Sequence, residues 1–337
     1  MIYLFIIFSN QKTFDTRNFK CHNYVAYGDI MEKNSLNVYS FHVTTKFHDA
    51  AILPAFKGAT LRGAFGIALK NTVCINKKIQ NCNDCFISSH CAYKKIFCVD
   101  VSRKDNTFNV PVPVILEPPY EKQTFYKQGS LFSFHCIIVE KIIDYFPYLI
   151  VAFKTMGDQG IGIKPNRARF ELIKIKNANR IIYDEKSQML KDYKKPVKIK
   201  TSARNGNTIT LEFISPVRVK SNGNLVEGLP FPLLIKILLR RISLLKKIYS
   251  EGENLNIDCE KLIEKSFSVE VVCSSLKWYD WQRYSTRQKI RMKLGGLVGK
   301  ITYYGEIQEF LPYLKIGELI RVGKNTSFGL GKYVIIE

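Results

Sequence analysis

The sequence predicts an α+β fold built from two tandem domains with the same order of elements, and three observations support this. A length of 337 residues suits two domains of ordinary size. Each half contains an apolar, helix-like run followed by a glycine-rich basic segment, at 157–169 and at 323–332, and each segment leads into a strand-like run. Hydrophobic residues make up 46% of the chain, enough for a core in each domain. A unit that recurs at about half the chain length is typical of a duplicated fold.

Residue periodicity places the elements of the first half. β-Branched and aromatic residues at 35–47 predict the first strand, and apolar residues recur at helical spacing through 61–69, where Thr60 is the expected N-cap. The remaining elements expected in this half are strands at 98–102, 110–116, 131–139 and 170–175, and a helix at 145–156.

The second half repeats this order. Its expected elements are strands at 208–220, 267–277, 297–304 and 333–336, a strongly apolar helix at 231–249 and an amphipathic segment at 307–319. Two β-α-β-β-α-β units in tandem are two ferredoxin-like, or RRM-like, domains. The expected organisation is a poorly patterned leader at 1–30, an N-terminal domain at 31–182 with a cysteine-rich insertion at 74–98, a basic linker at 183–206, and a C-terminal domain at 207–337.

The charge of the chain predicts a nucleic-acid partner. Formal net charge is +22, and 22 Phe and 18 Tyr supply surfaces on which bases can stack. Sheets of the predicted kind commonly bind single-stranded or hairpin RNA. The densest basic cluster holds no acid and is predicted to contact RNA phosphates, with a solvated surface as the alternative; it consists of Arg283, Arg287, Lys289, Arg291 and Lys293.

The glycine-rich loop 323–331 is a second predicted RNA contact. Glycine allows a backbone to approach a ligand closely and the flanking lysines favour phosphate, although many such glycine pairs are structural turns. The predicted contacts are Lys324, Thr326, Ser327, Phe328, Gly329 and Gly331. A further basic run at 164–204 contains 13 Lys or Arg against four acids, and either a solvated linker or RNA contact explains it.

The sequence gives no sign of a membrane segment. No apolar stretch approaches the roughly 20 residues that span a bilayer, and residues 1–8 are too few and lack the basic start of a signal peptide. We therefore expect a cytoplasmic protein.

Four cysteines fall within 18 residues: Cys74, Cys82, Cys85 and Cys91. In a reducing compartment this spacing favours a metal over disulfides, and four thiolates around one tetrahedral ion leave no open position for chemistry. The predicted cofactor is thus a structural zinc ion that stabilises the insertion, with no catalytic metal. His90 and Cys98 are spare candidate ligands, and an iron–sulfur cluster or reduced thiols remain alternatives.

Several motifs together resemble a known family. They are the run from Leu53 to Gly66, the end of the cysteine array at Cys91-Ala-Tyr93, Tyr284 to Lys289, Leu294 to Gly299, and Gly323 to Gly331. In this order they are similar to the CRISPR-associated precursor-RNA processing endoribonucleases of the repeat-associated mysterious protein superfamily, from about residue 40 to the C-terminus. The resemblance implies metal-independent cleavage of CRISPR repeat RNA by two ferredoxin-like domains, producing guide RNAs for antiviral defence.

Such cleavage uses the substrate's own 2′-hydroxyl as the nucleophile and leaves a 2′,3′-cyclic phosphate. The protein must align the two groups, move two protons and offset charge on the phosphorane. Family members often use a histidine near the first strand and first helix. We predict His48, because His42 is mid-strand, His135 sits in an apolar strand where a core role is expected, His90 belongs to the cysteine array and His22 lies in the leader. A histidine in a surface loop is the alternative for His48. Lys57 and Arg62 are the predicted charge stabilisers, and Tyr284 an orienting group.

Two other functions stay open at this point. A non-catalytic subunit that binds CRISPR RNA within an effector complex explains the same basic surface. A zinc-dependent DNA-binding factor is a weaker alternative, since no recognition helix accompanies the cysteines. The expected partners are CRISPR repeat RNA, its processed guide RNA and a CRISPR effector complex, and the expected protein is a monomer or homodimer.

Overall fold

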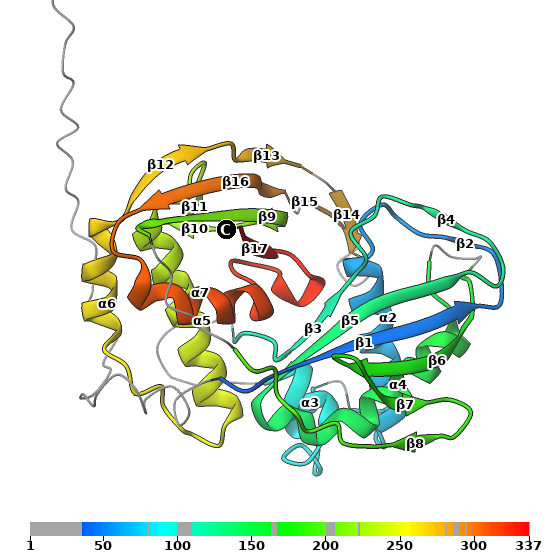
Figure 1. Ribbon diagram of the computed structural model, residues 1–337. Coiled ribbons are helices and arrows are strands. Elements are labelled where there is room, and N and C mark those ends of the chain that lie inside the picture. Colours follow the sequence, from blue (N-terminus) through cyan, green and yellow to red (C-terminus); the bar gives the residue numbers. More distant parts are fainter. Residues whose placement is uncertain are drawn as a thin grey trace, which may run out of the picture.

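The computed structural model describes residues 36–79, 81–99, 110–162, 167–199, 206–221, 223–280 and 295–336, together with the backbone of 282–285 and 290–293. The described chain forms two halves side by side, each with an antiparallel sheet and helices on one face (Figure 1). A single hydrophobic core of buried residues runs through both halves.

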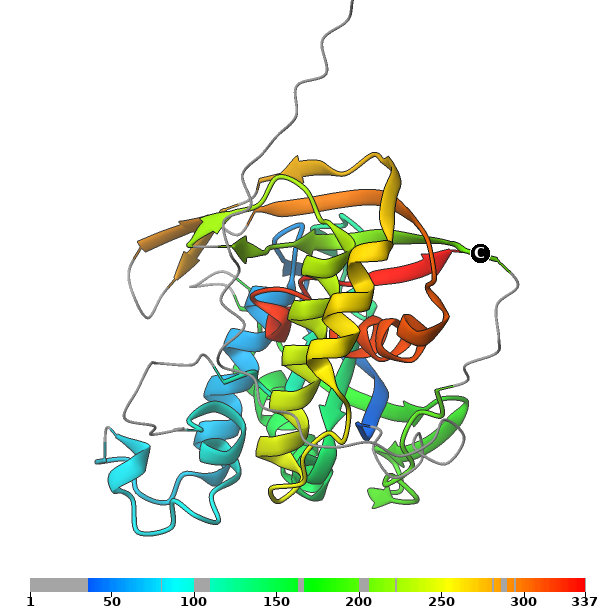
Figure 2. The ribbon, with the colours of Figure 1, turned by 90° about the vertical axis from the view of Figure 1, so that its left-hand side faces the viewer.

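The N-terminal sheet has the strand order β3-β5-β1-β6-β7-β8. Its helices α2 and α3 lie on one side of the strands (Figure 2), and Figure 1 views the sheet from its helix-free side. The elements of this half are β1 (Val38–Phe47), β2 (Ala51–Ile52), α2 (Gly58–Val73), η1 (Cys82–Asp84), α3 (Ala92–Phe97), β3 (Val114–Glu117), β4 (Phe125–Tyr126), β5 (Leu131–Val139), η2 (Glu140–Tyr145), α4 (Phe146–Gln159), β6 (Phe170–Asn177), β7 (Arg180–Asp184) and β8 (Met189–Leu190).

The C-terminal sheet has the order β12-β16-β9-β17. Its elements are β9 (Thr208–Val217), β10 (Lys220–Ser221), β11 (Asn224–Leu225), α5 (Phe231–Tyr249), α6 (Cys259–Lys265), η3 (Ser266–Ser268), β12 (Glu270–Ser274), β13 (Lys277–Tyr279), β14 (Gln282–Ser285), β15 (Ile290–Lys293), β16 (Gly296–Tyr304), η4 (Gln308–Phe310), α7 (Leu311–Ile320), η5 (Thr326–Phe328) and β17 (Tyr333–Ile336). Apart from the added strands, both sheets place the second, third, first and fourth strands of their half in that spatial order, as a ferredoxin-like domain does.

Alternation along the strands explains which face carries the helices. In β1, Phe41 and Val43 are fully buried, and the Phe41 ring stacks on Phe146 of α4 with 4.1 Å between centroids. In β5, Phe132 and Phe134 are buried in the same way. Side chains of alternate residues point to opposite faces of a strand, so the residues between these aromatic rings lie on the helix-free face.

Apart from the strand expected at 98–102, most of which lies outside the described residues, the predicted order of elements is confirmed, and the bounds of β5, α5 and β17 match the predicted ranges. The N-cap prediction is wrong: α2 begins at Gly58 with Lys57 as its N-cap, so Thr60 lies in the first turn. Cys98 and Val99 are not in a strand. The predicted linker at 183–206 contains β8, which extends the N-terminal sheet through β7. Among the described helices, none has the length and apolar character needed to cross a membrane.

Buried polar contacts join the two halves. The Lys246 ammonium of α5 lies 3.4 Å from the Glu140 carboxylate of η2, and both side chains are almost completely buried. The Tyr249 hydroxyl donates to the Pro111 carbonyl at 3.0 Å. Arg321, directly after α7, donates to the carboxylate of Glu117 on β3, so the C-terminal ends of both α5 and α7 are joined to the N-terminal half.

Candidate functional site

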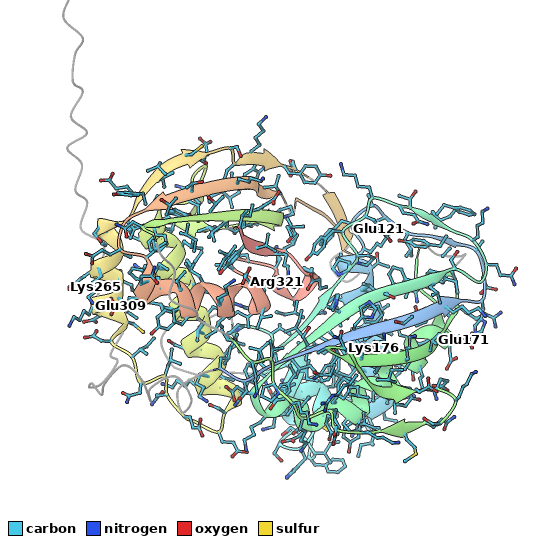
Figure 3. The ribbon with its side chains drawn as sticks, viewed as in Figure 1. Glu121, Glu171, Lys176, Lys265, Glu309 and Arg321 are labelled. Atoms are coloured by element: carbon cyan, nitrogen blue, oxygen red, sulfur yellow. The ribbon has the colours of Figure 1, made fainter. Side chains whose placement is uncertain are left out.

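Four polar residues form a row across the helix-free face of the N-terminal sheet. Strand register places Glu117 of β3 opposite His135 of β5, His135 opposite His42 of β1, and His42 opposite Lys176 of β6. Directly paired residues of antiparallel strands share a face, so these side chains are neighbours. Figure 3 labels Lys176 on this sheet and Arg321, the partner of Glu117, in the adjoining C-terminal half.

The two histidines are the centre of this row. The imidazole rings of His42 and His135 lie 4.9 Å apart between centroids in an edge-on arrangement. His42 is half-buried and His135 is exposed. The Thr44 hydroxyl lies 3.5 Å from Nδ1 of His42, at the limit of a hydrogen bond. Both rings thus lie on the sheet surface, and His135 is the more accessible of the two.

Lysines surround the two rings. Burial lowers the pKa of His42, and His135, Lys176 and Lys174 lower it further. Burial and then the Lys332 charge lower the pKa of His135. The pKa of Lys332 itself is lowered to about 8 by burial and by Arg321, with Glu318 opposing. We call His42, His135, Lys174, Lys176 and Lys332 the histidine cluster.

Prediction of a core role for His135 is wrong. In β5 the inward residues are Phe132, Phe134 and Cys136, and His135 falls between them on the exposed face. The alternation of aromatic and polar residues at 131–136 is the signal from which this orientation could have been read.

The predicted catalytic residue His48 lies elsewhere. It is exposed directly after β1, and its backbone N–H donates to the Arg169 carbonyl at 2.9 Å. Next to it, Asp49 pairs with Arg169, with 3.2 Å between carboxylate and guanidinium. Its catalytic role stays a prediction.

Lys57 and Arg62 do not accompany His48 in an open site. Lys57 is fully buried, and its ammonium donates to the carbonyls of Ala55 at 3.2 Å and Glu121 at 3.0 Å. Burial lowers its pKa. The Arg62 guanidinium lies over the rings of Phe97 and Phe328, 4.5 and 5.8 Å from their centroids. Lys57 thus anchors the segment before α2 and does not face an open site, whereas Arg62 packs on aromatic rings and its predicted role stays a prediction.

The glycine-rich loop 323–331 is a junction rather than an open cradle. Thr326 and Ser327 are buried, and a Cβ at Gly329 would meet Pro118 at 2.7 Å. A Cβ at Gly58, in the first turn of α2, would overlap the carbonyl oxygen of Phe328. Gly331 lies against Val322. Gly329 and Gly331 are also buried, Phe328 is half-buried and Lys324 is exposed; the RNA contacts predicted for this loop stay a prediction.

The densest predicted RNA-binding cluster falls outside the described side chains. Strands β14 and β15 pair with each other, with Arg283 opposite Met292 and Tyr284 opposite Arg291. Their side chains, and those of Arg287, Lys289 and Lys293, belong to the part of the chain that the structure does not describe.

The four cysteines converge on one small cavity. Cys74 caps the end of α2, Cys82 begins η1, Cys85 follows it, and Cys91 caps the start of α3. All four line a cavity of about 20 Å³, together with Ile75, Ile79, Ile87 and Tyr93. Within the described residues, no three Cys, His, Asp or Glu side chains are arranged as a ligand set. Zinc stays a prediction.

Fold and surface together define a class of protein: tandem ferredoxin-like domains whose N-terminal sheet carries histidines and lysines on its helix-free face. Residues 211–333 match the family model described as CRISPR-associated endoribonuclease Cas6, and residues 36–195 match a model described as an N-terminal domain. The Cas6 match covers the C-terminal half of this chain, so that half is similar to the CRISPR-associated Cas6 endoribonucleases.

Individual proteins are similar to most of the chain. An uncharacterized protein of Archaeoglobus fulgidus is 27% identical over 288 residues, which cover 84% of this chain and 92% of the relative. A solved Cas6 product complex has a TM-score of 0.55 at 13% identity and covers 88% of this chain and 100% of its own. Thermus thermophilus Cas6 has a TM-score of 0.50 at 13% identity, covering 90% and 99%. At these identities the solved structures show a shared fold.

Proposed function

We propose that this protein cleaves CRISPR repeat RNA without a catalytic metal and so produces guide RNAs for antiviral defence. The match of residues 211–333 to the Cas6 endoribonuclease model supports repeat-RNA processing. The observation that carries the cleavage step is the histidine cluster, in which two neighbouring imidazoles lie among three lysines on a sheet surface without helices. Imidazole is the side chain best suited to moving protons near neutral pH, and lysines attract phosphate.

The proposed reaction needs no external nucleophile. A base accepts the proton of the 2′-hydroxyl, whose oxygen bonds to the adjacent phosphorus. The bond from phosphorus to the 5′-oxygen breaks, and an acid gives that oxygen a proton. The products are a 2′,3′-cyclic phosphate and a 5′-hydroxyl. Cations beside the phosphate offset the charge that develops on the phosphorane.

The test is single-turnover incubation of purified protein with a repeat transcript in excess EDTA, followed by analysis of the product ends. We expect shortened RNA that carries the two ends named above. RNA retarded in a gel but never shortened would instead support the second candidate, a subunit that binds CRISPR RNA without cutting. Loss of cutting in EDTA, with the fold intact, would contradict the metal-independent mechanism.

We also propose that the basic cluster at 283–293 contributes phosphate contacts. Replacing Arg287, Lys289 and Arg291 with Ala should weaken affinity for every RNA. The log–log slope of affinity against salt should fall by roughly 0.7 to 0.9 per lost contact. Unchanged affinity and slope would make the cluster a solvated surface. The same titrations by light scattering would show whether the protein binds as a monomer or a homodimer.

Zinc in the cysteine cavity is a separate proposal with a structural role. The four thiols lie at element ends around one small, mostly apolar space, and a metal would draw them into a tetrahedron. Elemental analysis of protein purified without chelator should give about one zinc per chain. The Cys82→Ser, Cys85→Ser variant should lose the metal and become protease-sensitive. Metal-free, folded wild-type protein would end this proposal.

A further inference from the structure

We propose that His42 and His135 form the acid–base pair of the cleavage site, with Lys174, Lys176 and Lys332 holding the scissile phosphate beside them. This inference rests on the proposed function. From the sequence, His42 is set aside because it lies in the middle of a strand, and His135 is expected to lie in the core. The inference assigns the chemistry to the middle of the N-terminal sheet rather than to His48, which follows the end of β1.

The spacing of the two rings suits an in-line displacement. The attacking and leaving oxygens lie on opposite sides of the phosphorus, and two-metal nucleases serve them with ions about 3.5–4 Å apart. Two imidazoles 4.9 Å apart between centroids have a comparable separation. Each ring comes from a central strand, β1 or β5, so both are held by the paired backbone of a sheet.

The charges around the pair fit a phosphate and both proton transfers. Lys174 and Lys176 on β6 and Lys332 before β17 flank the rings, while the one carboxylate in the row, Glu117, is engaged by Arg321 and lies 3.7 Å from Lys332. In free protein, burial and then the neighbouring cations favour neutral imidazole, which is the form that accepts the 2′-hydroxyl proton. A bound phosphodiester offsets these cations and so favours a proton on the second ring, which donates it to the 5′-oxygen.

His48 lacks these surroundings. Its neighbours are the Asp49–Arg169 pair and the Arg169 carbonyl. The two hypotheses therefore predict different losses of activity from single substitutions at His42, His135 and His48.

The experiment measures single-turnover cleavage of a repeat transcript in EDTA, with affinity in parallel, for His42→Ala, His135→Ala, the double variant and His48→Ala. Tyr148→Ala, an exposed change on α4 behind the sheet, is the control and should cut at the wild-type rate. Each pair variant should lose about 100- to 10,000-fold in rate with a much smaller loss of affinity. The double variant should lose little more than the worse single, because the two residues act as a unit.

Two further readouts separate chemistry from folding. The pH profile of kcat/KM for the wild type should be bell-shaped with its optimum below about 6.5, because both free imidazole pKa values are lowered. Each limb of this profile reports the titration of one histidine, so each single variant should lose one of the two limbs. His42→Gln and His135→Gln keep a polar side chain of similar size, so they should fold and remain slow; recovery of the rate by glutamine would mean a structural role.

Outcomes distinguish this inference from the proposed function. A wild type that does not cut any repeat RNA would remove both. A wild type that cuts, with both pair variants at its rate, would overturn the pair alone. Loss confined to His48→Ala would likewise overturn the pair and favour the residue at the strand end.

Discussion

The two glycine-rich loops occupy equivalent places in the two domains but differ at one residue. After α4, Gly160 caps the helix with φ 70° and Ile161 pairs with Ala168, two residues before β6. After α7, Arg321 caps the helix with φ 68°. The next residue, Val322, occupies the position equivalent to Ile161, and its N–H donates to the carbonyl of Gly331, two residues before β17, at 3.1 Å.

The difference lies in what the cap residue reaches. Gly160 packs against the backbone of Ala168 within its own domain. Arg321 adopts a backbone conformation that is essentially reserved for glycine, at a cost of order 1–3 kcal/mol, while its guanidinium donates to Glu117 of the other domain. The comparison teaches that glycines in such a loop are found where two backbone segments lie close together. Arg321, which replaces glycine at the helix cap, lies at the junction of the two domains.

The largest expected effect is at Arg321. Arg321→Met should lower the free energy of unfolding by about 3–5 kcal/mol, because Glu117 would remain buried without its main partner. Arg321→Gly removes the same guanidinium and also the backbone strain, so it should be less destabilising than Arg321→Met. Chemical denaturation of both variants and the wild type gives the free energies of unfolding to be compared. Equal stability of Arg321→Met and wild type would show that the pair contributes nothing to the junction.

The second effect concerns the helix that faces this loop. Gly58→Ala should lower the free energy of unfolding by about 1–3 kcal/mol, because its Cβ would overlap the Phe328 carbonyl. Gly63→Ala, in the same helix with open space around it, is the matched control and should raise stability by about 0.5–1 kcal/mol. Thermal denaturation gives both values. Similar gains from the two changes would mean that α2 and the loop are not in contact.

The smallest expected effect is a pH dependence from Lys332. Its pKa is about 8 when folded against 10.5 for an ordinary lysine, so between these values the folded protein holds fewer protons than the unfolded chain. Stability therefore rises with pH in this window. The Lys332→Met variant lacks this gain. Its free energy of unfolding should therefore fall by about 1–3 kcal/mol relative to wild type between pH 8 and 10.5. This range allows for the 20% exposure of the Lys332 side chain. Lys324→Met, an exposed lysine of the same loop, should show no such trend.

Much of the fold could be predicted because long elements carry their own periodicity. The apolar stripe along α5 and the alternation of apolar and polar residues along β5 were enough to predict both elements from the local sequence. The pairs β2–β4 and β7–β8 escaped prediction because strands of two to five residues have too few positions to show a period.

The candidate site was less accessible, because it depends on register between distant segments. His42 and His135 become neighbours only when β1 pairs with β5 at one particular offset. Burial of Lys57 likewise depends on carbonyls at Ala55 and Glu121, which no local pattern brings together. Charge and glycine content predicted an RNA-binding protein, but they could not separate residues of the domain junction from residues of the surface.

The most direct test of the account is cleavage of a repeat RNA in which the nucleotide 5′ to the mapped scissile phosphate lacks its 2′-hydroxyl. With wild-type protein in excess EDTA, the account predicts that this RNA binds with nearly the affinity of the unmodified repeat and stays intact, while the unmodified repeat is cut to a 2′,3′-cyclic phosphate. Cutting of the 2′-deoxy substrate at the same bond would contradict attack by the neighbouring hydroxyl and, with it, the acid–base role assigned to the histidine cluster.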